Sequence, residues 1–135
     1  MNVLVDTHTL LWALTDESKL SERARKLLPR AETWFSVASP WEILIKAQAG
    51  KMSLPRPTGP FLMSKLALNG VRVLPVMADH VLRMESLPNH HRDPFDRLLI
   101  AQSLEEKIPL VTGRPCVRSL SSGSHLVIRN KSESK

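Results

Sequence analysis

The chain has 135 residues, of which 42% are hydrophobic and 24% are charged, so we expect one globular domain rather than two. Nineteen Lys and Arg against thirteen Asp and Glu leave a net charge of +6, which favours a polyanionic partner. With three Trp, three Phe and no Tyr, a platform that stacks successive bases is not expected. A bound nucleic acid is therefore expected to be held mainly through its phosphates.

Two further features bear on where the protein works. No apolar run approaches the roughly 20 residues that cross a bilayer, and the N-terminus lacks the basic start and cleavage site of a secretory signal. Cys116 is the only cysteine, so no disulfide can form within the chain. We therefore expect a cytoplasmic protein with no membrane partner.

Short apolar strands alternate with helical patterns along the chain. The expected strands are residues 3–5, 34–38, 71–76, 110–112 and 126–128. The expected helices are residues 10–14, 21–28, 40–51, 61–68, 78–87 and 94–107. This alternation predicts an α/β protein with three layers, α/β/α, whose central, mostly parallel sheet has about five strands. Residues 1–130 are expected to form the domain, and residues 131–135 a polar C-terminal tail.

A polar segment interrupts the apolar residues after the first strand. Asp6 follows Val3, Leu4 and Val5 directly, and residues of this kind suit a strand buried on both faces. Ligand sites of open α/β sheets lie where such strands end. Thr7 follows at once and can hydrogen-bond Asp6 or cap the next helix. Asp6 is therefore the first candidate for a functional residue.

Two helix starts share one pattern, SPWE at residues 39–42 and DPFD at residues 93–96. Each pattern predicts a capping residue, proline at the first helical position and an acid in the first turn, and capping is the simpler role for each acid taken singly. If both helices begin where the first strand ends, Glu42, Asp93 and Asp96 converge on Asp6. Clustered carboxylates repel one another unless a cation is present, and their hard oxygens select Mg²⁺ or Mn²⁺.

Four segments carry a resemblance to a known family: LVDTHTLLWAL, SVASPWEILIKAQAGKM, HHRDPFDRLLIAQSL and IPLVTG, in this order over residues 3–113. With them the chain resembles a PIN domain, and within that family a VapC-like ribonuclease toxin of type II toxin-antitoxin systems. The resemblance implies a PIN-like fold and an endoribonuclease that uses Mg²⁺ or Mn²⁺ to hydrolyse RNA phosphodiester bonds. It also implies neutralisation by a cognate antitoxin, and a homodimer.

The resemblance assigns roles to individual residues. Asp6, Glu42 and Asp96 match the first three acids of the family, and Asp93 is a neighbouring acid. We expect Asp6 and Asp96 to be the principal metal ligands, while Glu42 and Asp93 hold water molecules beside the ion. Three further residues are candidate contacts to the RNA substrate: Thr7, Lys46 and Arg114.

One position departs from the family. Members usually carry a fourth acid shortly after the LVT strand, whereas this chain has Arg114 there. The local charge changes by about two units, which weakens the attraction for a second divalent ion. Alternatively, Arg114 binds a substrate phosphate or points into solvent. Two hypotheses stay open: a nuclease with reduced or one-metal activity, and a catalytically impaired PIN module that acts as a binding or regulatory protein.

Overall fold

A parallel sheet of five strands forms the centre of the protein. The computed structural model describes residues 1–88, 93–112 and 127–129. The strands lie in the order β3-β2-β1-β4-β5, and every neighbouring pair is parallel, which confirms the predicted sheet. Their bounds are β1 (Asn2–Val5), β2 (Glu32–Ser36), β3 (Arg72–Leu74), β4 (Leu110–Thr112) and β5 (Val127–Arg129).

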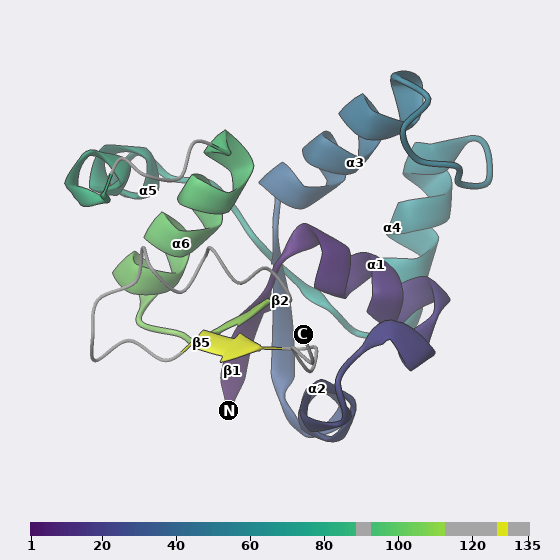
Figure 1. The fold of residues 1–135 in the computed structure, drawn as a ribbon, viewed down its shortest axis with the longest axis horizontal. Coiled ribbons are helices and arrows are strands. Elements are labelled where there is room, and N and C mark those ends of the chain that lie inside the picture. Colours follow the sequence, from purple (N-terminus) through teal and green to yellow (C-terminus); the bar gives the residue numbers. More distant parts are fainter. Residues whose placement is uncertain (89–92, 113–126, 130–135) are drawn as a thin grey trace.

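Helices pack on both faces of this sheet (Figure 1). The α-helices are α1 (Thr7–Thr15), α2 (Glu22–Leu27), α3 (Ala38–Gln48), α4 (Thr58–Leu68), α5 (Ala78–Arg83) and α6 (Pro94–Glu106). Short 3₁₀ turns are η1 (Glu17–Lys19), η2 (Leu28–Arg30) and η3 (Met84–Ser86). In the described part of the chain, no helix has the length and apolar character needed to span a membrane.

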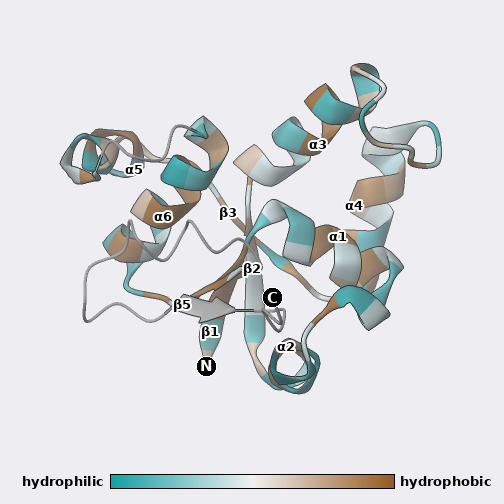
Figure 2. Cartoon of the chain, in the orientation of Figure 1, coloured by the Kyte–Doolittle hydropathy of each residue, from teal (hydrophilic) through white to brown (hydrophobic). Residues whose placement is uncertain are grey.

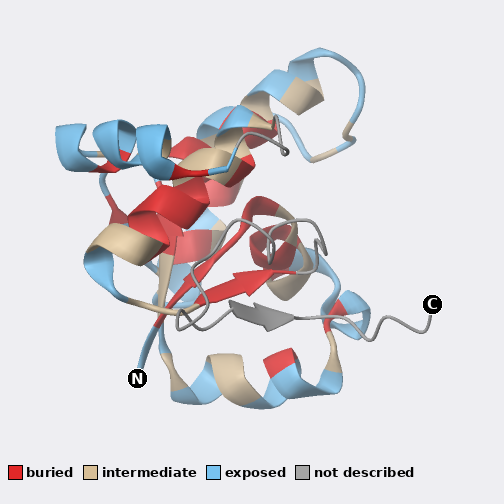
Figure 3. Ribbon diagram, turned by 60° about the vertical axis from the view of Figure 1, so that its left-hand side comes forward, coloured by how far each residue is buried: buried red, intermediate tan, exposed pale blue. Residues whose placement is uncertain are grey.

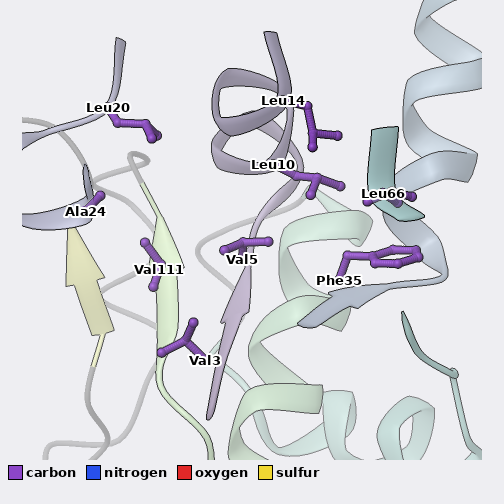
Figure 4. Close-up of a cluster of buried hydrophobic side chains, with 9 residues drawn as sticks. All are labelled: Val3, Val5, Leu10, Leu14, Leu20, Ala24, Phe35, Leu66 and Val111. Carbon is purple, nitrogen blue, oxygen red and sulfur yellow. The ribbon is translucent and has the colours of Figure 1, made fainter. Parts of the chain in front are cut away.

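The alternation of side chains along β1 explains the three layers. Successive residues of a strand point to opposite faces, so Val3 and Val5 contribute to one core cluster and Leu4 to another. The first cluster lies under α1, α2 and α4 (Figure 4) and comprises Val3, Val5, Leu10, Leu14, Leu20, Ala24, Phe35, Leu66 and Val111. The second lies largely under α6 and comprises Leu4, Leu74, Leu87, Leu99, Ile100, Ala101 and Leu110.

α6 is buried on several sides, because residues 99–103 are all buried. Figure 2 shows hydrophobic and hydrophilic segments interleaved along α3 and α6, and Figure 3 shows buried residues concentrated in the central strands and in parts of the helices. A third, smaller cluster of Leu11, Ile43 and Leu62 joins α1, α3 and α4 away from the sheet. The helices beside the sheet therefore hold each other as well as the strands.

The start of α3 differs from the prediction. β2 ends at Ser36, and α3 begins at Ala38, two residues earlier than expected. The Ser36 hydroxyl accepts a hydrogen bond from the Ala38 amide at 3.0 Å. Ser39 lies inside the first turn, so its predicted role as the capping residue is wrong. Glu42 consequently lies two residues further into the helix than expected, beyond its first turn.

The start of α6 agrees with the prediction. Asp93 is the N-cap, and its Oδ1 accepts hydrogen bonds from the amides of Phe95 and Asp96 at 2.9 and 3.2 Å. Pro94 occupies the first helical position. A backbone amide at this position has no acceptor within the helix, so the missing N–H of proline breaks no helical hydrogen bond. The tail at residues 131–135 lies outside the described residues, so the domain boundary at residue 130 stays a prediction.

Two leucines on α4 test the assignment of the core. Leu66 is 2% exposed and belongs to the cluster under α1, whereas Leu68 is 79% exposed. We expect Leu66→Ala to lower the free energy of unfolding by about 2–5 kcal/mol, because it leaves a cavity. The matched change Leu68→Ala is expected to cost less than about 0.5 kcal/mol. Urea denaturation measures both, and equal losses would show that this face of α4 is assigned wrongly.

Candidate functional site

Asp6 sits at the junction between β1 and α1 with its carboxylate buried, only 2% exposed. Its Oδ1 accepts a hydrogen bond from the Thr9 amide at 2.8 Å and so caps α1. Its Oδ2 accepts a hydrogen bond from the hydroxyl of Thr112, at the end of β4. The Asp6 amide in turn donates to the Val111 carbonyl at 3.1 Å. Both ends of this residue are therefore fixed by the neighbouring strand and helix.

Glu42 is equally buried but has different partners. The Thr7 hydroxyl lies 2.6 Å from Glu42 Oε1, and the Lys46 ammonium lies 2.8 Å from Oε2. The hydroxyl of Ser39 lies 3.1 Å from that of Thr7. Because Thr7 follows Asp6 directly, these contacts join the first turn of α1 to α3. Each oxygen of the Glu42 carboxylate consequently has a donor within the protein.

Asp96 is the third buried carboxylate, 3% exposed, and it lies in the first turn of α6. The positive end of the helix dipole stabilises an ionised carboxylate at this position. Asp93 is half-buried and is engaged as the cap of the same helix. Asp93 thus orders the turn that carries Asp96.

The helices that carry these acids begin near one edge of the sheet, where the parallel strands end (Figure 1). The Trp41 and Phe95 rings make an edge-to-face contact, with centroids 5.1 Å apart and planes at 77°, between the beginnings of α3 and α6. Thr7 joins α1 to α3 through Glu42. The helices α1, α3 and α6 therefore begin close to one another at this end of the sheet.

The donor set suits a hard divalent cation. A carboxylate has about four lone-pair positions, and the two hydrogen bonds to Asp6 leave some of them open. Carboxylate oxygens are the ligands that Mg²⁺ and Mn²⁺ prefer. Among the residues that the structure describes, however, no three His, Cys, Asp or Glu side chains form a group that could hold an ion. Asp6 and Asp96 each offer a buried carboxylate of the chemical type that would suit such an ion.

The structure describes two of the three predicted substrate contacts. Thr7 is buried and contacts Glu42, and Lys46 is partly exposed and pairs with the same carboxylate. Arg114 lies outside the described residues, so its predicted role is untested. Sequence reasoning did not assign Thr112 to the site. The signal that could have found it is its position at the end of a strand, the same feature that singles out Asp6.

Two variants of Thr112 test how the Asp6 carboxylate is held. Thr112→Val removes the hydroxyl and leaves a buried charge with one donor fewer, so we expect the free energy of unfolding to fall by about 1–3 kcal/mol. Thr112→Ser keeps the hydroxyl and loses one methyl group, for which about 1 kcal/mol is expected. Chemical denaturation compares the two. A valine variant as stable as the wild type would show that this hydrogen bond contributes nothing.

Comparisons with known proteins agree with this architecture. No curated protein sequence matches the chain. One chain of the VapBC2 complex from Rickettsia felis, bound to a DNA fragment from its promoter, is 16% identical with a TM-score of 0.64 and covers 96% of this chain and 98% of that one. A toxin-antitoxin complex from Klebsiella pneumoniae matches at 13% identity and a TM-score of 0.63, over 96% and 99%.

A third structure, FitAB bound to an IR36 DNA fragment, matches at 12% identity and a TM-score of 0.57, over 88% of this chain and 92% of that one. At such identities the likeness concerns the fold. The family comparison goes further, because the model for the PIN domain matches residues 3–113, most of the chain. The chain belongs to the PIN domain family.

Proposed function

We propose that this protein is a VapC-like toxin, a metal-dependent endoribonuclease that hydrolyses RNA phosphodiester bonds and is neutralised by a cognate antitoxin. The observation that carries the proposal is the buried carboxylate of Asp6 at the end of β1, whose hydrogen-bond donors among the described residues, the Thr9 amide and the Thr112 hydroxyl, are neutral. The net charge of +6 suits an RNA substrate. The two toxin-antitoxin complexes of similar fold support an antitoxin as the partner.

In this proposal Asp6 and Asp96 hold a Mg²⁺ or Mn²⁺ ion. The chemistry that such an ion supplies is activation of water and neutralisation of charge on the phosphate. Thr9 and Thr112 fix the orientation of the Asp6 carboxylate, and Asp93 orders the helical turn of Asp96. The proposed role of Glu42 and Asp93 is to hold water molecules beside the ion.

Substrate contacts and assembly belong to the same proposal. Lys46 keeps 29% of its side chain exposed, so its ammonium can meet a phosphate of the RNA backbone. Thr7 and Arg114 are proposed as further contacts to the substrate. We also propose that residues 1–130 form the whole PIN domain, that the protein works as a homodimer, and that it acts on RNA in the cytoplasm.

Substitution of the two proposed ligands tests the metal site. We expect Asp6→Asn and Asp96→Asn each to weaken Mn²⁺ binding by at least about tenfold, because each removes a negative ligand. Asp79→Asn, a change at an exposed acid on α5, is the matched control and is expected to bind as the wild type does. Calorimetric titration measures the affinities. Unchanged affinity in Asp6→Asn would remove this residue from the site.

Cleavage of RNA tests the activity itself. Purified protein freed of antitoxin is expected to cut a pool of structured RNA in Mg²⁺ or Mn²⁺, and to stop when EDTA is in excess. Both ligand variants should lose this activity, while Asp79→Asn retains it. Cleavage that persists without a divalent ion would contradict the proposed mechanism.

The impaired module is the second candidate, and the presence of Arg114 at the position of the family's fourth acid favours it. If this position lies beside the ion, Arg114→Asp should raise both Mn²⁺ affinity and the cleavage rate, because it restores negative charge. If Arg114 grips a substrate phosphate, the same change should slow cleavage although metal binding improves. The cleavage rates of the wild type and of Arg114→Asp, measured at matched Mn²⁺ and salt concentrations, decide between these two roles. An unchanged rate would place Arg114 outside the site. A wild-type protein that binds Mn²⁺ but does not cleave RNA would favour the catalytically impaired module.

A further inference from the structure

Glu42 and Asp6 are both buried, yet their charges are balanced in different ways. The Asp6 carboxylate accepts hydrogen bonds from an amide and a hydroxyl, which are neutral donors. Glu42 has the ammonium of Lys46 at 2.8 Å, in addition to the Thr7 hydroxyl at 2.6 Å. A carboxylate removed from water is costly unless an opposite charge compensates it. The protein itself supplies that charge to Glu42.

The ion pair of Glu42 and Lys46 is built into α3. The two residues are four apart, with the acid nearer the N-terminus, which is the favoured order on a helix. The acid is 2% exposed and the lysine 29%, so solvent and salt screen this pair less than a surface pair. The chain contains a comparison: Glu22 and Lys26 on α2 have the same spacing at 3.2 Å, but are 73% and 75% exposed. Such an exposed pair contributes little.

We infer that Lys46 acts as the fixed counter-ion of Glu42, so that the acidic site takes up a single divalent cation, at Asp6 and Asp96, and no second one at Glu42. This inference rests on the proposed function. In it, the Lys46 ammonium supplies the positive charge that a second metal ion supplies in a two-metal site. Lys46 is on this account a positioning residue, because its ammonium holds Glu42 from outside the metal shell.

The test counts Mn²⁺ ions by calorimetric titration at pH 8, with free Mn²⁺ followed by electron paramagnetic resonance. Wild type is expected to take one ion. Lys46→Met should take a second, because Glu42 then has no counter-ion and attracts the metal instead. Lys46→Arg keeps the charge and is expected to take one ion. Lys26→Met removes the exposed lysine of the comparison pair, and should also take one.

Glu42→Gln gives an independent result if Lys46→Met does not fold. It removes the charge that needs a counter-ion, and we expect it to take one ion, as the wild type does. A folded variant that takes no ion would make Glu42 a ligand and overturn the inference. Two ions in the wild type, or one ion in a folded Lys46→Met, would overturn it as well while leaving the ribonuclease proposal intact. A wild type that takes no Mn²⁺ contradicts the proposed function, and the inference with it.

Discussion

The buried carboxylate of Asp6 is the constraint on which the site depends. One oxygen caps α1 through the Thr9 amide, and the other accepts the hydroxyl of Thr112 from β4. A buried anion at this place is tolerable only when such donors are present. Those donors come together only because β4 pairs with β1 in parallel and α1 begins where β1 ends. The fold and the site therefore depend on the same strand order. This order buries the apolar residues and also brings together the hydrogen-bond donors to Asp6.

Two carboxylates with the same burial differ in the charge of their partners. Glu42 is compensated within the protein by Lys46, and Asp6 is held by neutral groups. Exposure alone does not distinguish these acids, since each is 2% exposed. The distinction lies in the charge of the partner, and in our proposal it directs an external cation to Asp6, whose partners among the described residues are neutral. On this view α3 contributes charge balance to the site, while α1 and α6 contribute the proposed ligands.

Much of this arrangement could be predicted from local sequence. The apolar run of Val3, Leu4 and Val5 predicted a strand buried on both faces, and Asp93 before Pro94 predicted the start of α6. The start of α3 could not be predicted in the same way, because Ser36 and Ser39 both suit a cap and the end of β2 decides between them. The contact between Thr112 and Asp6 spans 106 positions. It depends on which strands are neighbours, which residue spacing does not encode.

The most direct test of the account is the position of a bound ion. Crystals grown with Mn²⁺, measured near the manganese absorption edge, reveal the ion through its anomalous scattering. The account predicts a single peak between the carboxylates of Asp6 and Asp96, with Glu42 still paired to Lys46. A peak coordinated directly by Glu42, with the Lys46 ammonium displaced, would contradict it, and so would fully occupied crystals with no peak at Asp6.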